Sequence, residues 1–386
     1  MKKILAITGI RSDYDLLSSL LFRLNNDKDV ELKLLVGNAH LSQTYGMSVQ
    51  QIEKDGFDIL LKVESLIDGD SYQSRIKTAS IFLQNSIDVV AHYKPDLILY
   101  AGDRMEVIIG ALLGGYLEIP TIHFYAGDQG VDGHIDNPVR HAASKLSTCQ
   151  MVTIPQHKER LISIGENPER VKVVGSIALD RFVESEPHEV SRIKQSFGID
   201  NGFENFALVI YHPAVGEEEH CNIYFENILR ALRDSRICSF INIPNTDPGN
   251  KKILSVINQY KQENCFCFTS NMSRELFVSI FKRSMFIIGN SSAGVIESPS
   301  IPIPAINVGK RQKGRVADIN VINTNDDYSS IIDAIKKATS ADFISSIKNV
   351  KNTYGAGKSA ELAHKYIKEI DFKKLIRKIE DPLSFR

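Results

Sequence analysis

The densest group of side chains that could transfer protons lies in residues 123–141, HFYAGDQGVDGHIDNPVRH. This segment follows an apolar run and contains three aspartates and three histidines, more titratable groups than core packing requires. Asp128 and Asp136 could face one substrate from two positions of the loop, which suits carboxylates that remove and return a proton. Asp136 could instead be a structural residue at the start of the helix that Asn137 and Pro138 begin.

Metal and dinucleotide chemistry are both disfavoured by the motifs. Histidines and aspartates could ligate zinc, but the segment contains neither a pair of thiols nor the H-E-x-x-H spacing. The first apolar run ends in TGIRSDYD, which lacks the G-x-G-x-x-G spacing of NAD-binding turns. We therefore expect neither a metal nor a cofactor.

Charged turns also follow two other apolar runs. Arg11 comes directly after the first run, and Asp103 and Arg104 come directly after the run PDLILYAG. Ligands of α/β folds collect at the carboxyl ends of parallel strands, so these side chains are placed to meet an anionic ligand. Two ordinary alternatives stay open: Arg11 could be a solvated turn residue, and Asp103 could cap a helix that begins near Met105.

A single histidine stands in the corresponding position in the second half of the chain. His212 follows the apolar run ALVIY and precedes the acidic residues 217–219. A lone histidine is commonly structural, but its place at the end of a buried strand also suits catalysis.

The turn GNSSAG at 289–294 is the strongest indication of a phosphate site. A strand, a run of small residues and a helix start would present backbone N–H groups and two hydroxyls to an anion. Glu297 would then lie within reach of a ribose held at that helix start. A serine helix cap without a ligand is the alternative. The basic loop GKRQKGR at 309–315 suits a pyrophosphate, although alone it could equally be a solvated surface turn.

The elements that must position these groups form an alternating α/β pattern. Continuous apolar runs are typical of parallel strands buried on both faces, and helical periodicity fills the stretches between them, as in 72–93 and 223–232. The runs lie at 4–8, 32–36, 97–101, 121–125, 151–154, 171–174, 207–211, 240–243, 266–268 and 286–288. The pattern predicts doubly wound, Rossmann-like architecture in two domains, 1–182 and 183–360, with a charged helical pattern at 359–380.

Length and composition fit a two-domain globular protein. The chain has 386 residues, 43% hydrophobic and 24% charged. A net charge of -1 argues against nucleic acid as a partner. The first apolar run ends too soon, without a cleavage site, for a signal peptide, and no stretch approaches the roughly 20 apolar residues of a membrane span. With five cysteines expected to be reduced, we expect a cytoplasmic protein without a membrane partner.

Taken in order, six segments resemble the hydrolysing UDP-N-acetylglucosamine 2-epimerases of sialic and legionaminic acid biosynthesis. They are GIRSDYD, PDLILYAGDRMEV, HFYAGDQGVDGHIDNPVRHAASKLS, YHPAVGEE, IPNTDPGN and GNSSAGVIESPSIPIPAINVGKRQKGR. The resemblance implies a GT-B-like fold with two domains facing a cleft, a C-terminal helix at 361–386 that crosses back to the first domain, and a homodimer or homotetramer. It also implies conversion of UDP-GlcNAc or a related UDP-2-acetamido sugar to UDP and a free 2-epimer such as ManNAc.

The resemblance assigns roles by position. Asp103 and Asp136 match catalytic carboxylates, His212 matches a histidine of the cleft, and Asp128 matches a position that is acidic in the sialic acid branch. The implied substrate contacts are Arg11, Arg104, Arg140, Asn245, Gly289, Asn290, Ser291, Ser292, Glu297 and Arg311. The loop between Asp128 and Asp136 is longer than in the family pattern, and Tyr125 departs from it.

Three other functions remain open at this point. A GT-B glycosyltransferase would share the nucleotide site, and a non-hydrolysing 2-epimerase would release UDP-ManNAc. A nucleotide-sugar-binding regulatory module would need no turnover, but binding alone does not call for such crowded carboxylates.

Overall fold

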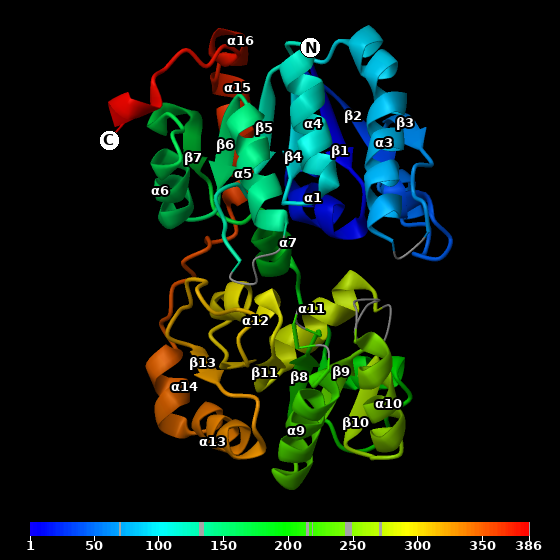
Figure 1. The fold of residues 1–386 in the computed structure, drawn as a ribbon. Helices are drawn as coiled ribbons and strands as arrows, with labels where there is room; N and C mark the ends of the chain where they lie inside the picture. The colour runs from blue at the N-terminus through cyan, green and yellow to red at the C-terminus, as the bar shows by residue number, and fades with distance from the viewer. Residues whose placement is uncertain are drawn as a thin grey trace. The chain divides into compact units, whose positions relative to one another are not determined.

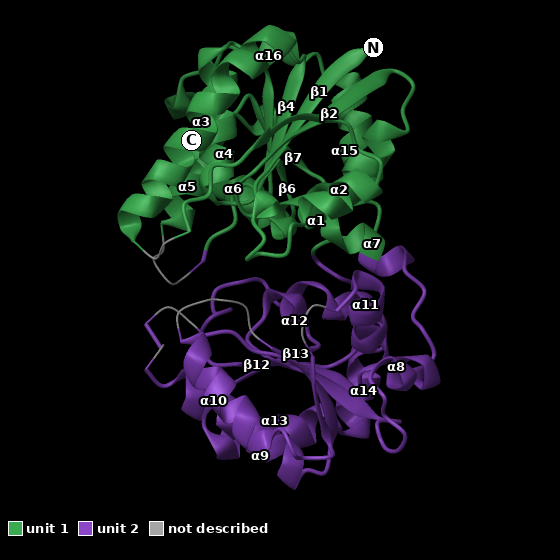
Figure 2. Cartoon of the chain, turned by 90° about the vertical axis from the view of Figure 1, so that its right-hand side faces the viewer, with its two compact units in different colours: residues 1–129, 133–181, 354–386 green, residues 130–132, 182–353 purple. Residues whose placement is uncertain are grey.

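The computed structural model describes residues 1–68, 71–130, 135–213, 216–217, 219–243, 249–269 and 272–385. The chain divides into two compact units (Figure 2). Unit 1 comprises residues 1–129, 133–181 and 354–386, and unit 2 comprises residues 130–132 and 182–353. The chain therefore returns to unit 1 at Tyr354 after completing unit 2.

Unit 1 is built on a seven-stranded parallel sheet in the order β3-β2-β1-β4-β5-β6-β7 (Figure 1). Its strands are β1 (Lys2–Thr8), β2 (Val30–Gly37), β3 (Ile59–Val63), β4 (Leu97–Ala101), β5 (Thr121–Phe124), β6 (Cys149–Val152) and β7 (Val171–Val173). Its helices are α1 (Arg11–Asn25), α2 (Val49–Lys54), α3 (Tyr72–Tyr93), α4 (Met105–Tyr116), α5 (Asp136–Leu146), α6 (Pro155–Ser163), α15 (Ser359–Glu369) and α16 (Phe372–Leu375), with α7 (Ala178–Glu184) leading into unit 2.

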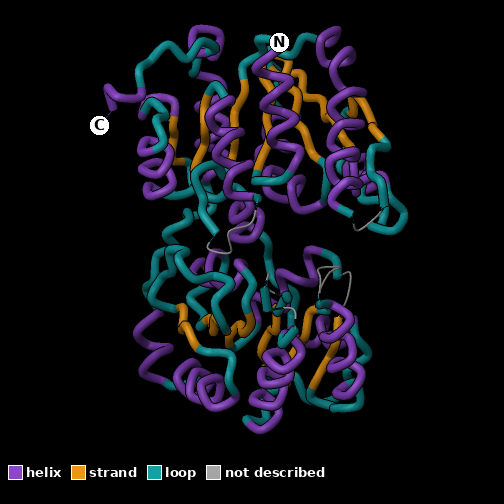
Figure 3. Tube along the Cα trace, viewed as in Figure 1, coloured by secondary structure: helices purple, strands orange, loops and turns teal. Residues whose placement is uncertain are grey.

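Both faces of this sheet are covered by helices (Figure 3). In β1, Ile4 and Ala6 pack with α1 and α15, whereas Leu5 and Ile7 pack with α3 and α4. Successive side chains of a strand point to opposite faces, so a sheet buried on both sides needs an unbroken apolar run. This is why the strand runs were recognisable in the sequence.

Unit 2 repeats the plan with six parallel strands in the order β10-β9-β8-β11-β12-β13. Its strands are β8 (Phe206–Ile210), β9 (Cys238–Asn242), β10 (Phe266–Thr269), β11 (Phe286–Gly289), β12 (Ala305–Val308) and β13 (Val321–Thr324). Its helices are α8 (Val190–Ser196), α9 (Cys221–Asp234), α10 (Asn250–Tyr260), α11 (Arg274–Arg283), α12 (Ser292–Ile296), α13 (Tyr328–Ala338) and α14 (Ala341–Ile347). One core lies against α9, α10 and α13, and a second against α8 and α11.

The strand order reverses direction once in each sheet, between β1 and β4 in unit 1 and between β8 and β11 in unit 2. Ligands of open α/β sheets bind at such switch points, outside the carboxyl ends of the strands. The predicted doubly wound, GT-B-like fold class is confirmed. Every predicted strand is present, and three further ones were missed: β3 and β13 are partly exposed edges, and prolines 302 and 304 interrupt the run that leads to β12.

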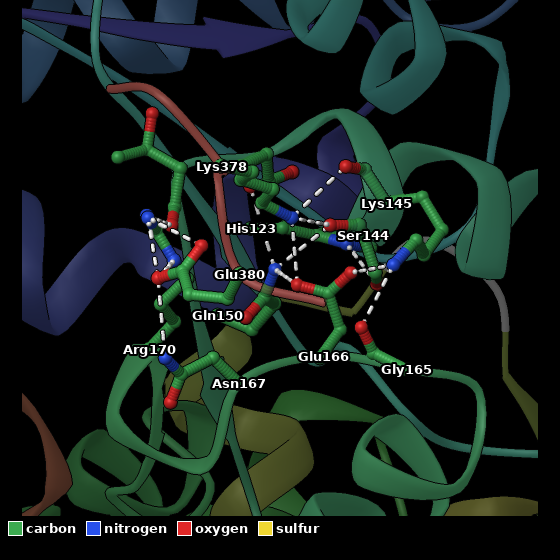
Figure 4. Close-up of polar contacts among 12 residues, drawn as sticks. His123, Ser144, Lys145, Gln150, Gly165, Glu166, Asn167, Arg170, Lys378 and Glu380 are labelled. Atoms are coloured by element: carbon green, nitrogen blue, oxygen red, sulfur yellow. Dashed lines mark hydrogen bonds and ion pairs between the residues drawn. The ribbon is translucent and has the colours of Figure 1, made fainter. Parts of the chain in front are cut away.

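The predicted C-terminal helical pattern is wrong in its length. α15 ends at Glu369, because Ile370 is extended, and Phe372 of the short α16 packs into the core of unit 1. The following residues contact α5 and the segment that precedes β7, where Lys378 contacts Ser144, Lys145 and Glu166, and Arg170 contacts Glu380 (Figure 4). These ion pairs hold an irregular segment in place of a continued helix.

None of the described helices is long and apolar enough to cross a lipid bilayer. All five cysteines are free thiols, of which Cys149 and Cys221 are buried.

Candidate functional site

The first cluster of candidate residues lies in unit 1, at the carboxyl ends of β4 and β5. After β4 the chain turns at Gly102, whose φ of 94° is a left-handed conformation that glycine adopts without strain. Arg104 is the residue that precedes α4, and no side chain caps this helix. Asp103 is therefore not a helix cap, and 30% of its side chain is exposed.

Arg140, from the middle of α5, ties the two turns together. Its Nη2 donates to the Asp103 carboxylate. Its Nη1 donates to the backbone carbonyl of Asp128 (2.9 Å) and to Oδ1 of Asn137 (3.1 Å). Only 6% of the Arg140 side chain is exposed, so this expected substrate contact is engaged with the protein. Its guanidinium fixes one candidate carboxylate relative to the backbone of another.

His123, one of the three histidines of the candidate segment, contacts the turn that carries Asp103. It is fully buried, and its Nε2 lies 2.8 Å from the carbonyl oxygen of Gly102 and its Nδ1 2.9 Å from Oγ of Ser144. Burial lowers its pKa to about 4. The imidazole is therefore neutral at physiological pH, donates from Nε2 to Gly102, and supports the turn that carries Asp103.

Asp128 has a partner that the sequence analysis missed. Nε2 of His157, in the first turn of α6, lies 3.3 Å from Oδ1 of Asp128, and Nδ1 of His157 lies 2.8 Å from Oγ1 of Thr153. The backbone N–H of Gln129 donates to the same carboxylate (2.8 Å). The position of His157 just after β6, on the next strand of the sheet, is the signal that could have identified it.

Asp136 is the first residue of α5, which begins one residue earlier than the sequence suggested. Its negative charge is close enough to Arg104 to affect the pKa of the Arg104 guanidinium. Partial desolvation lowers the pKa of the Arg104 guanidinium, but nearby negative charges outweigh this and raise it, namely those of Glu106, Asp13, Asp136 and Asp103. Carboxylates thus surround Arg104 at the switch point of unit 1.

Two members of that group, Asp13 and Glu106, are buried and were also missed. They are 7% and 5% exposed, and each lies in the first turn of the helix that follows a strand, α1 or α4. Burial, followed by the negative charge of Glu106, raises the pKa of Asp13 well above its usual range. A matching pattern could have revealed them, since Arg-x-acid follows both strands as Arg11-Ser12-Asp13 and as Arg104-Met105-Glu106. Arg11 itself is exposed and pairs with Asp15 at 3.8 Å.

The second cluster lies in unit 2, at the carboxyl ends of β8 and β11. Gly289 has a φ of 139°, and a Cβ atom there would stand 2.1 Å from the carbonyl oxygen of Ile210. The glycine therefore lets the two strand ends approach closely and brings Asn290 beside half-buried His212. Both polar atoms of the Asn290 amide bond the backbone of His212, at 2.8 and 2.7 Å.

The small-residue turn continues into a short helix. Ser291 is the N-cap of α12, and its Oγ accepts from the N–H of Ala293 (3.3 Å). Ser292 is the first residue of this five-residue helix, and Glu297 stands at its end. The predicted serine cap is present, and the hydroxyl of Ser292 is half-buried in the same turn.

The basic loop lies against this turn. Nη1 of Arg311 donates to the carbonyl oxygen of Asn290 (3.0 Å), as does Nε2 of Gln312 (2.9 Å). Exposed Arg311 and the turn at Gly289 thus come together in unit 2. Asn245 lies outside the described residues.

No group of three or more His, Cys, Asp or Glu side chains that could hold a metal ion occurs in the part of the chain that the structure describes. The unit 1 cluster can transfer protons, because it combines carboxylates with arginines. The unit 2 cluster, with hydroxyls, a histidine and a basic loop, suits an anion.

Sequence comparison shows which known proteins the chain is similar to. The family model described as UDP-N-acetylglucosamine 2-epimerase matches residues 23–368. The hydrolysing UDP-N,N'-diacetylbacillosamine 2-epimerase of Legionella pneumophila is 31% identical over 370 residues, which cover 96% of each chain. A UDP-N-acetylglucosamine 2-epimerase of Neisseria meningitidis is 30% identical over 340 residues, which cover 88% of each chain.

Solved structures share the fold. UDP-GlcNAc 2-epimerase from Neisseria meningitidis bound to UDP-GlcNAc superimposes with a TM-score of 0.80 at 17% identity, covering 95% of this chain and 100% of that one. The Methanocaldococcus jannaschii UDP-GlcNAc 2-epimerase in complex with UDP-GlcNAc and UDP gives a TM-score of 0.77 at 18% identity, covering 95% and 99%.

Proposed function

Because the chain belongs to the UDP-N-acetylglucosamine 2-epimerase family, we propose that it is a hydrolysing 2-epimerase that converts a UDP-2-acetamido sugar to UDP and the free 2-epimer. The substrate is UDP-GlcNAc or a relative with further substituents, and ManNAc is the product from UDP-GlcNAc. The observation that carries the proposal is the Arg140 fork, which joins the Asp103 carboxylate to the Asp128 turn.

The chemistry explains why carboxylates are needed. The C2 proton of the sugar is not α to a carbonyl, so direct removal is unfavourable. When the C1–O bond breaks, UDP leaves with the electron pair, and positive charge develops at C1. The adjacent C2 proton then passes to a carboxylate and a glycal remains. A water molecule then adds its hydroxyl group to C1 and gives its other proton to a carboxylate, while an acid returns a proton to C2 from the opposite face.

The two clusters have different roles in this reaction. Asp103, Asp128 and Asp136 supply the proton transfers in unit 1, where Arg104 and Arg140 balance their charge and Arg11 is a further substrate contact. The nucleotide binds in unit 2, at Gly289, Ser291, Ser292 and Glu297, with Asn245 and Arg311 as further contacts. Asn290 lies in the same turn, where its polar groups are bonded to the protein. His212 stabilises the departing diphosphate or delivers a proton to it.

The hydrolysing type is supported by the Legionella relative, whose name describes a hydrolysing enzyme. The same line of inference gives a cytoplasmic homodimer or homotetramer that works without a cofactor. Two alternative functions have to be distinguished by experiment: a non-hydrolysing 2-epimerase and a glycosyltransferase of the same fold class.

The deciding experiment is incubation with UDP-GlcNAc in heavy water, without an acceptor, followed by proton NMR. The proposal expects UDP and free ManNAc with deuterium at C2, since C2 is deprotonated and reprotonated from solvent. UDP-ManNAc would instead indicate the non-hydrolysing reaction. Free GlcNAc that keeps its C2 proton would indicate simple hydrolysis. UDP-N,N'-diacetylbacillosamine, the substrate named for the Legionella relative, is the parallel test if UDP-GlcNAc does not react.

A further inference from the structure

The side chain of Asn290 continues the strand pairing between β8 and β11 beyond its last backbone pair. Gly289 pairs with Ile210, and the N–H of Asn290 donates to the carbonyl of Ile210 (3.1 Å). Beyond this pair, the side-chain amide of Asn290 makes the next two hydrogen bonds. Its Oδ1 accepts from the N–H of His212 (2.8 Å), and its Nδ2 donates to the carbonyl of His212 (2.7 Å). Both backbone polar groups of His212 are thereby held by one side chain.

The backbone of Asn290 faces the basic loop at the same time. Its carbonyl oxygen accepts from Arg311 (3.0 Å) and from Gln312 (2.9 Å). Asn290 is 2% exposed and Gln312 is 6% exposed, so these bonds are shielded from water. Buried hydrogen bonds of this kind fix geometry, because breaking one leaves an unsatisfied polar group. Asn290 therefore connects the basic loop at 309–315 to His212 within unit 2.

We propose that Asn290 and Gln312 are positioning residues that hold His212 in its reactive place, and that the Asn290 side chain does not itself contact the substrate. The inference rests on the proposed function for the role of His212 in turnover. The chemistry of the amide is specific. Asparagine offers one acceptor and one donor at the spacing of a peptide group, whereas aspartate offers two acceptors and leucine offers neither.

The test uses Asn290→Asp in the full chain. The variant keeps the acceptor for the His212 N–H but places a carboxylate oxygen against the His212 carbonyl. We expect kcat to fall about 10- to 100-fold, the usual cost of losing a residue that orients a reactive group. UDP affinity by calorimetry should fall less than kcat, because the proposed phosphate contacts remain and only the added negative charge opposes binding.

Asn320→Asp is the matched control. Asn320 is fully buried in unit 2, and its Nδ2 donates to the carbonyl of Ile303 (2.8 Å). The control therefore carries the same buried charge against a carbonyl without touching His212. It should lose comparable stability while the folded protein keeps wild-type kcat. If Asn290→Asp does not fold, Gln312→Met removes one bond to the Asn290 carbonyl and should lower kcat in the same direction.

A second readout does not depend on turnover. The His212 imidazole resonance, assigned among the ten histidines by its loss in His212→Gln, should shift in Asn290→Asp or Gln312→Met and stay in place in Asn320→Asp. That shift would support the positioning role even if the wild-type protein released no free epimer, which would count against the proposed function alone. An unchanged resonance with normal kcat, or lost UDP binding with normal kcat, would overturn the inference.

Discussion

The guanidinium of Arg140, on α5, is hydrogen-bonded to the carboxylate of Asp103, which follows β4. The same guanidinium donates to the backbone carbonyl of Asp128 after β5, at 2.9 Å. One nearly buried side chain thus fixes two turns at neighbouring strand ends. Because a fork of this kind needs a planar group with several donors, lysine cannot replace it.

Arg140→Lys should therefore impair turnover more than it impairs nucleotide binding. The ammonium can satisfy only part of the fork, so Asp103 loses its fixed orientation, and we expect kcat to fall about 10- to 100-fold. UDP affinity should change little, since the proposed nucleotide contacts are in unit 2. Steady-state kinetics and calorimetry measure the two effects. Arg233→Lys, at a side chain that is 40% exposed, is the control, and an equal loss in both variants would contradict the prediction.

Asp103→Asn and Asp136→Asn should each abolish detectable turnover while UDP still binds. An amide keeps the size of the carboxylate but cannot take up a proton, so only the chemical step is lost. Product release followed by NMR, together with UDP calorimetry, measures both quantities. Wild-type turnover in either variant would remove that residue from the mechanism.

Much of the fold could be predicted because a strand that is buried on both faces of its sheet appears in the sequence as a continuous apolar run. A strand such as β1 has to be apolar at every position from Ile4 to Ile7. The edge strands β3 and β13 need no such run, and they were missed. The predicted length of the C-terminal helix was wrong for another reason. Its periodicity continues past Glu369, but the backbone is extended at Ile370 and Phe372 packs into the core of unit 1.

The candidate site was predictable only in part. The turns after β1, β4, β8 and β11 could be found, because polar residues that directly follow apolar runs can be recognised from the sequence alone. Their pairing could not, because Arg140 was expected only as a substrate contact, and His157 and Gln312 reach these turns from other elements. Sequence spacing does not show that the Asn290 amide is engaged with His212, nor that Arg140 is held by Asp103.

Ser292→Ala and Glu297→Ala should weaken UDP binding and leave folding largely unchanged. Both residues are half-buried at the ends of α12, where the proposed nucleotide site lies. Loss of one hydrogen bond to a charged ligand corresponds to about 1.5–3 kcal/mol, or roughly a 10- to 100-fold higher dissociation constant. Calorimetry with UDP measures this. Unchanged affinity in both variants would place the nucleotide elsewhere.

Asp13→Asn should stabilise the protein, and increasingly so as the pH rises. Burial, with Glu106 nearby, raises the pKa of Asp13 in the folded state, so the folded protein binds a proton that the unfolded chain has released. Wild-type stability from this residue is therefore greatest at low pH and declines as the pH rises from about 4, where an unfolded aspartate ionises, through the raised folded value. The Arg104 charge opposes this effect only partly.

Melting temperatures of the two proteins between about pH 4 and 8 provide the measurement, since that interval begins at the ordinary aspartate pKa. The Asn variant should melt higher, with a gap that widens toward neutral pH. Asp15→Asn, on the same helix but 30% exposed, should show no such widening. A gap that narrows with rising pH would mean that the folded state favours the ionised Asp13 carboxylate.

Lys378→Met should destabilise unit 1 through α5. Lys378 donates to the carbonyl oxygens of Ser144 (3.2 Å) and Lys145 (2.9 Å) in the last turn of α5, and to Glu166 (2.6 Å), which is 1% exposed (Figure 4). A cation at a helix C-terminus binds carbonyls that the helix leaves open. Methionine fills the same space but provides no donor.

The expected loss is about 2 kcal/mol in the free energy of unfolding, less than the roughly 3–5 kcal/mol for a fully broken buried pair. It is smaller because Lys145 still lies 2.9 Å from Glu166. Lys373→Met is the matched control, since its ion pair with Asp96 is 76% exposed on the lysine side and should change stability by no more than about 0.5 kcal/mol. Urea denaturation of the full chain measures both. Equal stability of the two variants would show that the C-terminal segment only covers unit 1 and does not hold α5.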